Sequence, residues 1–258
     1  NDFFKDNHYY ILKNGLSGII KSIENKISNS DYMTIKKETS LIDIDINDKI
    51  ITTNKENKYS YDNIIFTIPK NNLKDISLFK NDIIFDSVQS INLIRIYAQY
   101  PTENLWFKDI KRTITDNYIR HIIPINYEKG IIMISYTDDI YAKLWKNYEN
   151  INESFLIKAL HKEIKKLFGI KPPEPININT YYWNNGLHLW KPGYDIDELY
   201  TKILNYNKNI FIAGESYSKK QGWIEGSLET IYDIFKSSNF ENFRAITNYK
   251  QNNNINVI

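Results

Sequence analysis

The feature that most constrains the fold is one continuous segment near the C-terminus, residues 209–231. Its opening residues form an apolar run of strand type that stops at Gly214. A polar loop follows, and Gly222 and Gly226 then bracket the start of a predicted helix that runs to Phe235. Glycine lets a ligand approach the backbone, and the free amides at a helix N-terminus attract negative charge. The segment therefore predicts either a site for a phosphate or an anionic ring, or a plain strand–loop–helix connection with glycine caps.

The N-terminal third combines one helical pattern with short strand patterns. Apolar residues at helical spacing predict an amphipathic helix within residues 4–27, most clearly after Gly15. Residues 61–69 form a largely apolar run that ends at a proline, which is typical of a central strand buried on both faces. Between these elements, β-type segments predict a small meander over residues 32–35, 41–46 and 49–53.

The middle third has the pattern of a sheet. Strand-type segments follow one another over residues 85–136, which predicts an antiparallel sheet. Asn152 begins a helix with one apolar stripe that ends before Gly169, and we expect this helix to pack on the sheet. Residues 181–193 are interpreted as an aromatic loop, and residues 251–254 as a frayed tail. Together the elements predict an α+β fold.

Composition and charge exclude several classes of function. The chain has no Cys, so it can form no disulfide, thiolate zinc site, cysteine nucleophile or thioether link to a cofactor. Its 33 Lys and Arg against 31 Asp and Glu give no global field that would attract nucleic acid or an anionic membrane. The apolar runs are far shorter than the roughly 20 residues of a membrane helix. The four His show no metal-ligand spacing, and the Gly-x-Ser-x-Gly elbow of serine hydrolases is absent.

Two motifs of the C-terminal segment, Phe211-Ile-Ala-Gly-Glu215 and Gly222-Trp-Ile-Glu-Gly226, carry a resemblance to a known family. They resemble the flavin-binding signature of the flavin-containing amine oxidases, the group that includes monoamine and polyamine oxidases. The resemblance spans residues 15–235, and residues 93–101 and 135–139 look like the branch found in giant DNA viruses. Further stretches are similar to landmarks of the family in the same order: Gly15-Leu-Ser17, residues 61–69, Trp106-Phe107, Trp183 and Trp190-Lys-Pro-Gly193.

The resemblance implies a bound FAD. The chain has no cysteine, so a thioether link is excluded and the FAD is expected to be held non-covalently in that respect. Glu215 would bond the sugar or ribityl hydroxyls, and Gly214 would let the pyrophosphate side come close. A helix N-terminus beside the flavin would favour the negative charge of the reduced ring. The other residues implied to bind the cofactor lie at the opening of the helix, along the isoalloxazine ring: Gly222, Trp223, Ile224 and Gly226.

The resemblance also implies three residues at the catalytic site. Trp223 would form one aromatic wall of the substrate site, with a core tryptophan as the alternative. The other wall would come from residues 181–190, where the sequence offers His188 and Trp190 and we prefer Trp190. The family's catalytic-site lysine belongs on the strand before Trp106, and Arg95 takes that place here. Because arginine cannot be deprotonated, either Arg95 clamps a substrate carboxylate or oxidase activity is weakened. The remaining alternative is an arginine on a wet strand face.

One part of the family pattern is missing from the sequence. The dinucleotide fingerprint Gly-x-Gly-x-x-Gly does not occur. We therefore expect the C-terminal two-thirds of a longer flavoprotein, or a missing N-terminal segment that is cleaved, disordered or supplied as a companion chain. The predicted domains are an FAD-lobe segment, a substrate-binding lobe, a second FAD-lobe segment and a tail: residues 1–86, 87–180, 181–238 and 239–258.

The preferred interpretation is an FAD-dependent amine oxidase. A small amine would give hydride to the flavin, and O2 would reoxidise the flavin and yield H2O2. No metal, nucleic acid or membrane is expected as a partner. Two alternatives stay open: an amino-acid oxidase, and a catalytically silent structural protein, such as a virion component, that retains the amine oxidase fold. The cytoplasm and the virion are both compatible locations.

Overall fold

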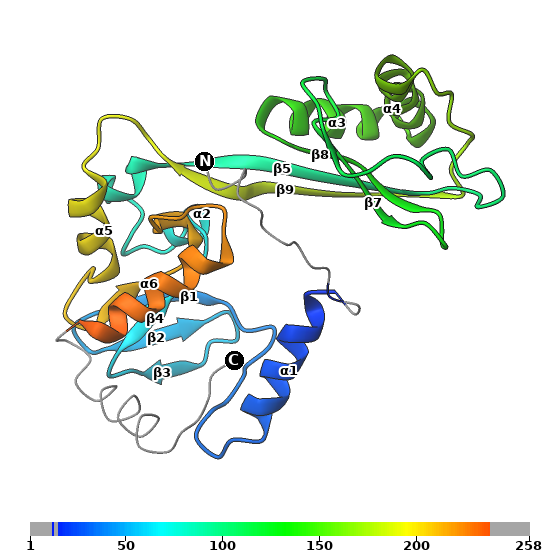
Figure 1. Cartoon of the computed structure of the whole chain (residues 1–258). Coiled ribbons are helices and arrows are strands. Elements are labelled where there is room, and N and C mark those ends of the chain that lie inside the picture. The colour runs from blue at the N-terminus through cyan, green and yellow to red at the C-terminus, as the bar shows by residue number, and fades with distance from the viewer. Residues whose placement is uncertain (1–11, 13–14, 238–258) are drawn as a thin grey trace. The chain divides into compact units, whose positions relative to one another are not determined.

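The computed structural model describes residue 12 and residues 15–237, which fall into two compact units divided between Ser60 and Tyr61. In the first unit, helix α1 precedes an antiparallel three-stranded sheet in the order β1-β2-β3 (Figure 1). The helix and the small sheet confirm the helix and the meander predicted for this region. Residues 4–11 of the predicted helix lie outside the described part. The bounds are α1 (Ser17–Ser28), β1 (Leu41–Asp45), β2 (Ile50–Thr53) and β3 (Lys58–Ser60).

One strand predicted in this unit is absent. Tyr32 lies in a turn, residues 33–35 have no regular secondary structure, and none of the four pairs with a described strand. Tyr32 is 96% exposed, so its aromatic ring gains little from strand pairing. The β-type composition of this segment therefore misled the prediction, because strand propensity acts through packing against neighbours.

The second unit contains a parallel strand pair. Strand β4 (Ile64–Phe66) lies beside β10 (Ile210–Ile212), with Ile64 opposite Ile210 and Phe66 opposite Ile212. Both predicted apolar runs are thus strands. Within the described residues β10 is the neighbour of β4, and the central position of β4 in a larger sheet stays a prediction.

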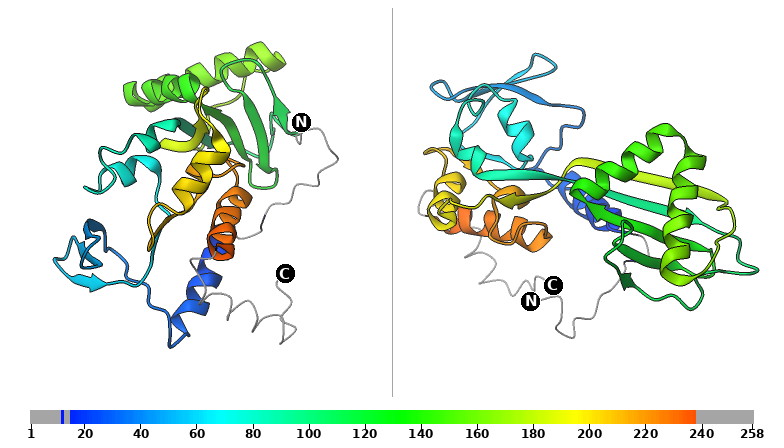
Figure 2. Two further views of the ribbon diagram at one scale, coloured as in Figure 1. Left: turned by 90° about the vertical axis from the view of Figure 1, so that its left-hand side faces the viewer. Right: turned by 90° about the horizontal axis from the view of Figure 1, so that it is seen from above.

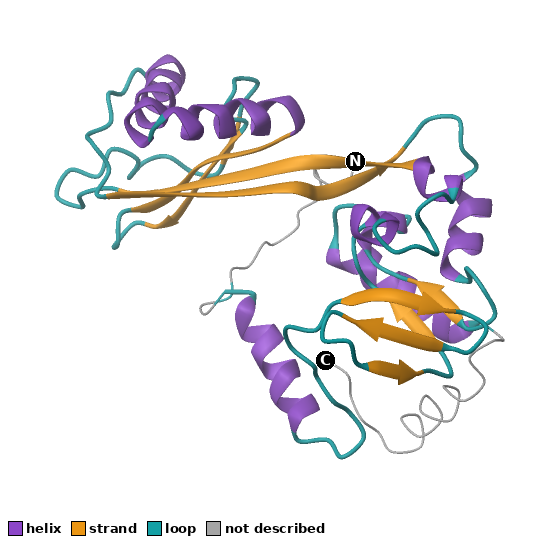
Figure 3. Ribbon diagram, turned by 180° about the vertical axis from the view of Figure 1, so that it is seen from behind, coloured by secondary structure: helices purple, strands orange, loops and turns teal. Residues whose placement is uncertain are grey.

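A five-stranded antiparallel sheet forms the rest of the framework of this unit, and it confirms the sheet predicted over the middle third. Its two longest strands, β5 and β9, run side by side along their length (Figures 1 and 3). The strand order is β6-β7-β8-β5-β9, with bounds Thr113–Ile114, His121–Asn126, Ile131–Asp138, Val88–Gln99 and Asn177–Trp190.

The aromatic loop predicted over residues 181–193 is wrong, because β9 extends through Trp190. Tyr181 pairs with Arg95 and Trp190 pairs with Val88, so the backbone is satisfied by β5 along this stretch. Aromatic residues pack well on a pleated surface, which accounts for a strand where several polar residues indicated a loop. The predicted domain boundary at residue 180 consequently falls inside a continuous strand.

Two helices, rather than the single helix predicted, cover one face of the sheet (Figure 2). They are α3 (Asp139–Ile151) and α4 (Glu153–Phe168). The predicted cap is confirmed, since Asn152 Oδ1 accepts the Phe155 N–H at 2.8 Å. The predicted end is confirmed as well, because Gly169 adopts the left-handed conformation. The buried core between helices and sheet includes Ile94, Ile96, Trp145, Leu156 and Leu160.

The remaining helices surround the parallel pair. Phe211 of β10 is fully buried against α5 (Ile196–Leu204) and α6 (Ile224–Lys236). Helix α6 confirms the predicted C-terminal helix and begins two residues before Gly226. No helix of the described chain combines the length and apolar character needed to cross a bilayer. Short helical segments complete the unit: α2 (Lys70–Lys74), η2 (Ile83–Ser87) and η3 (Glu215–Tyr217). The predicted tails, residues 239–258 and 251–254, lie outside the described residues.

Candidate functional site

A cavity of about 320 Å³ opens where β4 and β10 end. Its lining comes from residues 67–69 after β4, residues 214–216 after β10, the first half of α6, and Asn185 and His188 of β9. Ligands of sheets with parallel strands bind in the crevice outside the carboxyl ends of those strands. The cavity therefore lies where the topology favours a ligand site.

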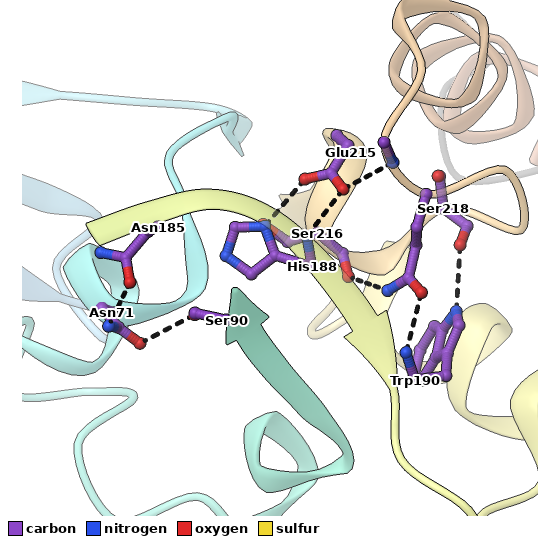
Figure 4. A network of polar contacts seen from close by, with 10 residues as sticks. Asn71, Ser90, Asn185, His188, Trp190, Glu215, Ser216 and Ser218 are labelled. Carbon is purple, nitrogen blue, oxygen red and sulfur yellow. Dashed lines mark hydrogen bonds and ion pairs between the residues drawn. The ribbon is translucent and has the colours of Figure 1, made fainter. Parts of the chain in front are cut away.

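The Glu215 carboxylate is the centre of a polar network at this cavity (Figure 4). Its Oε1 accepts the backbone N–H groups of His188 at 3.0 Å and of Gly222 at 2.7 Å. Its Oε2 lies 2.8 Å from Nδ1 of the His188 ring. Burial works to raise the pKa of Glu215, but the hydrogen bonds from His188 and Gly222 outweigh it, and the pKa is lowered. The carboxylate is thus ionised at neutral pH.

His188 is a buried polar side chain of the cavity wall, with an exposed fraction of 2%. Its Nδ1 also lies 3.2 Å from the Ser216 hydroxyl. Because an ionised carboxylate can only accept, the proton between Glu215 and the ring belongs to Nδ1. The other ring nitrogen, Nε2, is buried and has no hydrogen-bond partner among the described residues.

Gly214 and Gly226 of the sequence motifs are required for different structural reasons. Gly214 adopts φ +123°, a conformation that side chains rarely tolerate, and its N–H donates to the Thr230 hydroxyl at 2.9 Å. A Cβ there would meet only the Thr67 carbonyl oxygen, at 3.8 Å, which is ordinary van der Waals contact, so the backbone conformation rather than crowding favours glycine. Gly226 is different, because a Cβ would lie 2.2 Å from the Lys220 carbonyl oxygen. Gly214 lines the cavity, whereas Gly226 packs α6 against the preceding loop.

The predicted aromatic walls do not line this cavity. Trp190 is half-buried, and its Nε1 donates to the Ser218 carbonyl at 3.0 Å while its backbone N–H donates to Gln221 Oε1 at 2.8 Å. Trp223 and Ile224 stand at the start of α6 with exposed fractions of 49% and 62%. The structure thus brings Gly214, Glu215 and the Gly222 N–H together, and places the other predicted residues around them.

Arg95 lies on the face of the five-stranded sheet that α3 and α4 leave open. It pairs with Tyr136 of β8 and Tyr181 of β9, and its guanidinium carbon is 4.8 Å from the centre of the Tyr136 ring. Its buried Nε has no partner among the described residues. On the same face Tyr181 and Trp183 stack with ring centres 6.3 Å apart. This open aromatic face, defined by Arg95, Tyr97, Tyr136, Tyr181 and Trp183, does not line the cavity described above.

Sequence reasoning left several cavity residues without a role. His188 was considered only as an alternative to Trp190 for a wall of the substrate site, and its pairing with Glu215, 27 positions away, was not predicted. Ser216, Ser227 and the residues after β4 were given no role at the site, because the parallel pairing that brings them together is not visible in the sequence. Within residues 15–237 no three His, Asp or Glu side chains gather as metal ligands would.

The chain is similar in sequence to one family of known proteins and to single proteins of two other organisms. The sequence model of a family described as flavin containing amine oxidoreductase matches residues 1–230. A protoporphyrinogen oxidase of Dictyostelium discoideum is 26% identical over an alignment 264 positions long. The alignment covers 83% of this chain and 48% of that protein. An uncharacterized protein of Acanthamoeba polyphaga mimivirus is 31% identical over 137 residues, 46% of this chain and 26% of the relative. The chain thus spans about half, or less, of the length of these relatives.

A solved structure shares the fold. It is a protein of Exiguobacterium sp. 255-15 that carries a provisional description as a protoporphyrinogen oxidase. The TM-score is 0.63 at 14% sequence identity, and the match covers 88% of this chain and 52% of that one. At this identity the likeness supports the arrangement of the elements and nothing finer.

Proposed function

The chain belongs to the family of flavin-containing amine oxidoreductases, and from this premise we propose that it forms part of an FAD-dependent oxidoreductase. The observation that carries the proposal is the cavity beyond β4 and β10, which is lined by Gly214 and by His188, a residue whose buried Nε2 has no partner among the described residues. Bound FAD would supply the hydride acceptor.

The residues of the cavity fit a flavin in their chemistry. The Ser216 hydroxyl, the Asn185 amide and the His188 ring suit ribityl hydroxyls and ring nitrogens, while Leu228 and Ile231 suit the flat apolar part of the ring. Gly214 would allow the backbone to approach the cofactor. The absence of Cys from the sequence supports non-covalent attachment.

We propose an amine as the substrate, oxidised at the carbon beside its nitrogen, with O2 as the final acceptor and H2O2 as the product. The chain's own part would be to orient the substrate on the open aromatic face and to keep water away from it. Arg95 would bind a carboxylate of the substrate, because its guanidinium lies on that face with Nε unpartnered among the described residues.

A second candidate is the oxidation of a larger ring compound that bears carboxylates. The name of the Dictyostelium relative, protoporphyrinogen oxidase, favours it. The stacked pair Tyr181 and Trp183 beside Arg95 favours it as well, because a flat ring can stack on exposed aromatic side chains while a carboxylate reaches the guanidinium.

The first experiment tests the cofactor. We expect the protein at its full natural length to be purified yellow, or to become yellow when FAD is added, and to release FAD on acid denaturation. A protein that stays colourless with added FAD would contradict the proposal and favour the catalytically silent structural protein.

The second experiment tests the substrate class. Anaerobic bleaching of the flavin absorbance is measured with a plain amine, an amino acid and a porphyrinogen, followed by peroxide release in air. We expect Arg95→Lys to slow bleaching by carboxylate-bearing substrates more than by plain amines. Arg120→Lys is the matched control, because Arg120 stacks on Tyr141 in the same unit and is expected to leave the ratio unchanged. An equal effect of Arg95→Lys on both substrate types would refute the carboxylate role.

A further inference from the structure

We propose that Nε2 of His188 is the atom that accepts a hydrogen bond from the flavin, and that Glu215 fixes this polarity by holding the proton on Nδ1. The donor on the flavin would be its imide N–H or a ribityl hydroxyl. The inference rests on the proposed FAD site. It assigns a role to His188, which lies outside the two sequence motifs that carry the family resemblance.

The burial of His188 is the first reason. Nearly all buried polar atoms of folded proteins have a hydrogen-bond partner, so an orphaned one calls for an explanation. Nε2 of His188 is such an atom among the described residues, on a ring that is 2% exposed. His188 lines the cavity together with Asn185, and Nε2 points away from Glu215 (Figure 4). A ligand in the cavity is the partner that this nitrogen lacks.

The fixed orientation of the ring is the second reason. Glu215 holds His188 at two points, the backbone N–H and Nδ1, at 3.0 and 2.8 Å. The Ser216 hydroxyl lies 3.2 Å from the same ring nitrogen. With the ring held in this way, a hydrogen bond to the ligand requires little further ordering.

The position of the ring proton decides whether Nε2 donates or accepts in the hydrogen bond to the flavin. Glu215 is ionised and accepts at Oε2, so Nδ1 carries a proton, and in the neutral tautomer that this bond selects the lone pair lies on Nε2. The carboxylate itself already accepts three hydrogen bonds, from His188 twice and from Gly222. The proposal therefore moves the direct ligand contact predicted for Glu215 onto His188.

The test uses two variants that remove the acceptor by different routes. In His188→Asn the amide nitrogen can take the place of Nδ1 and keep the bond to Glu215, but nothing takes the place of Nε2. In Glu215→Gln the amide oxygen must face the two backbone N–H groups, so the NH2 group faces Nδ1. The ring proton then moves to Nε2, which turns the acceptor into a donor while the ring stays in place.

The readout is the dissociation constant of FAD, measured by flavin fluorescence on the protein at its full natural length. Both variants are expected to raise it about tenfold, the loss typical of one buried hydrogen bond. His161→Asn is the control, because His161 bonds the Tyr100 hydroxyl at 3.0 Å on the helix-covered side of the sheet. It is expected to bind FAD as the parent does. Thermal unfolding of the FAD-free His188→Asn protein is expected to match the parent.

The outcomes separate this inference from the proposed function. If the parent binds FAD and both variants bind it equally well, the role of His188 is refuted while the FAD site stands. If His161→Asn weakens binding as much as His188→Asn, the loss is not specific to Nε2 and the inference fails. If the parent itself does not bind FAD, the proposed function fails first.

Discussion

Gly226 allows a direct test of the close packing between α6 and the loop that precedes it, beside the candidate site. It lies in the first turn of that helix, where a Cβ would be 2.2 Å from the Lys220 carbonyl oxygen and 2.4 Å from the Ser218 hydroxyl. A contact with a backbone carbonyl cannot be relieved by a change of rotamer. Gly226→Ala must therefore push α6 away from the loop or distort the loop.

The expected magnitude follows from two opposing effects. Overpacking of a tight site costs about 1–3 kcal/mol, and the backbone obstacle at Gly226 places this case near the upper end. Alanine stabilises a helix by about 1 kcal/mol relative to glycine. The difference predicts that Gly226→Ala lowers the free energy of unfolding by about 2 kcal/mol.

Urea unfolding measures this effect, with a lower midpoint and an unchanged slope as the expected result. Ser218→Ala provides the companion variant, because it removes one of the two obstacles and leaves the Lys220 carbonyl in place. We expect the double variant to regain only part of the lost stability. A Gly226→Ala protein that is more stable than the parent would refute the reasoning, because helix propensity would then act without a clash.

Two further predictions concern the five-stranded sheet and the helices that cover it. Asn152→Ala should lower the stability by about 1 kcal/mol in thermal unfolding, because the hydrogen bond from the Phe155 N–H is lost, whereas Asn152→Asp should retain it. Stability should also fall as the pH is lowered below about 6.5: burial lowers the pKa of His161 and of His121, so the unfolded chain binds protons before the folded one does. His161→Gln should flatten part of that slope in urea titrations at several pH values, and an unchanged slope would contradict the assignment.

The parts of the fold that could be predicted are those with a local signal. The strand before Gly214 and the helix between Asn152 and Gly169 carry their own start and stop residues, and both formed as predicted. Helix α3 was missed because its residues have mixed propensity and only Ala142 and Trp145 are buried. Its apolar residues do recur at helical spacing, as those of α4 do, so this helix could have been predicted from the sequence.

In the candidate site, too, the residues with a local sequence signal were predicted and those that depend on tertiary packing were not. Gly214 and Glu215 are neighbours in a recognisable motif, and the structure places both at the cavity. His188 could not be assigned, because its role depends on a carboxylate 27 positions later and on β9 being a strand. Arg95 was placed correctly on a strand, but which face it occupies depends on the helices that cover the other one.

Strand β9 joins the two regions to which chemistry is proposed. It carries Tyr181 and Trp183 on the open aromatic face and His188 at the cavity, and its pairing with β5 holds all three. The register shifts between these two groups, where Gly186 leaves no room for a side chain: a Cβ would lie 2.2 Å from the Leu93 Cβ. Because a slip of one residue moves each later side chain to the other face, the tight contact at Gly186 fixes His188 relative to the aromatic pair. Gly186 would thereby fix the distance between the ligand proposed for His188 and the substrate proposed for the open aromatic face.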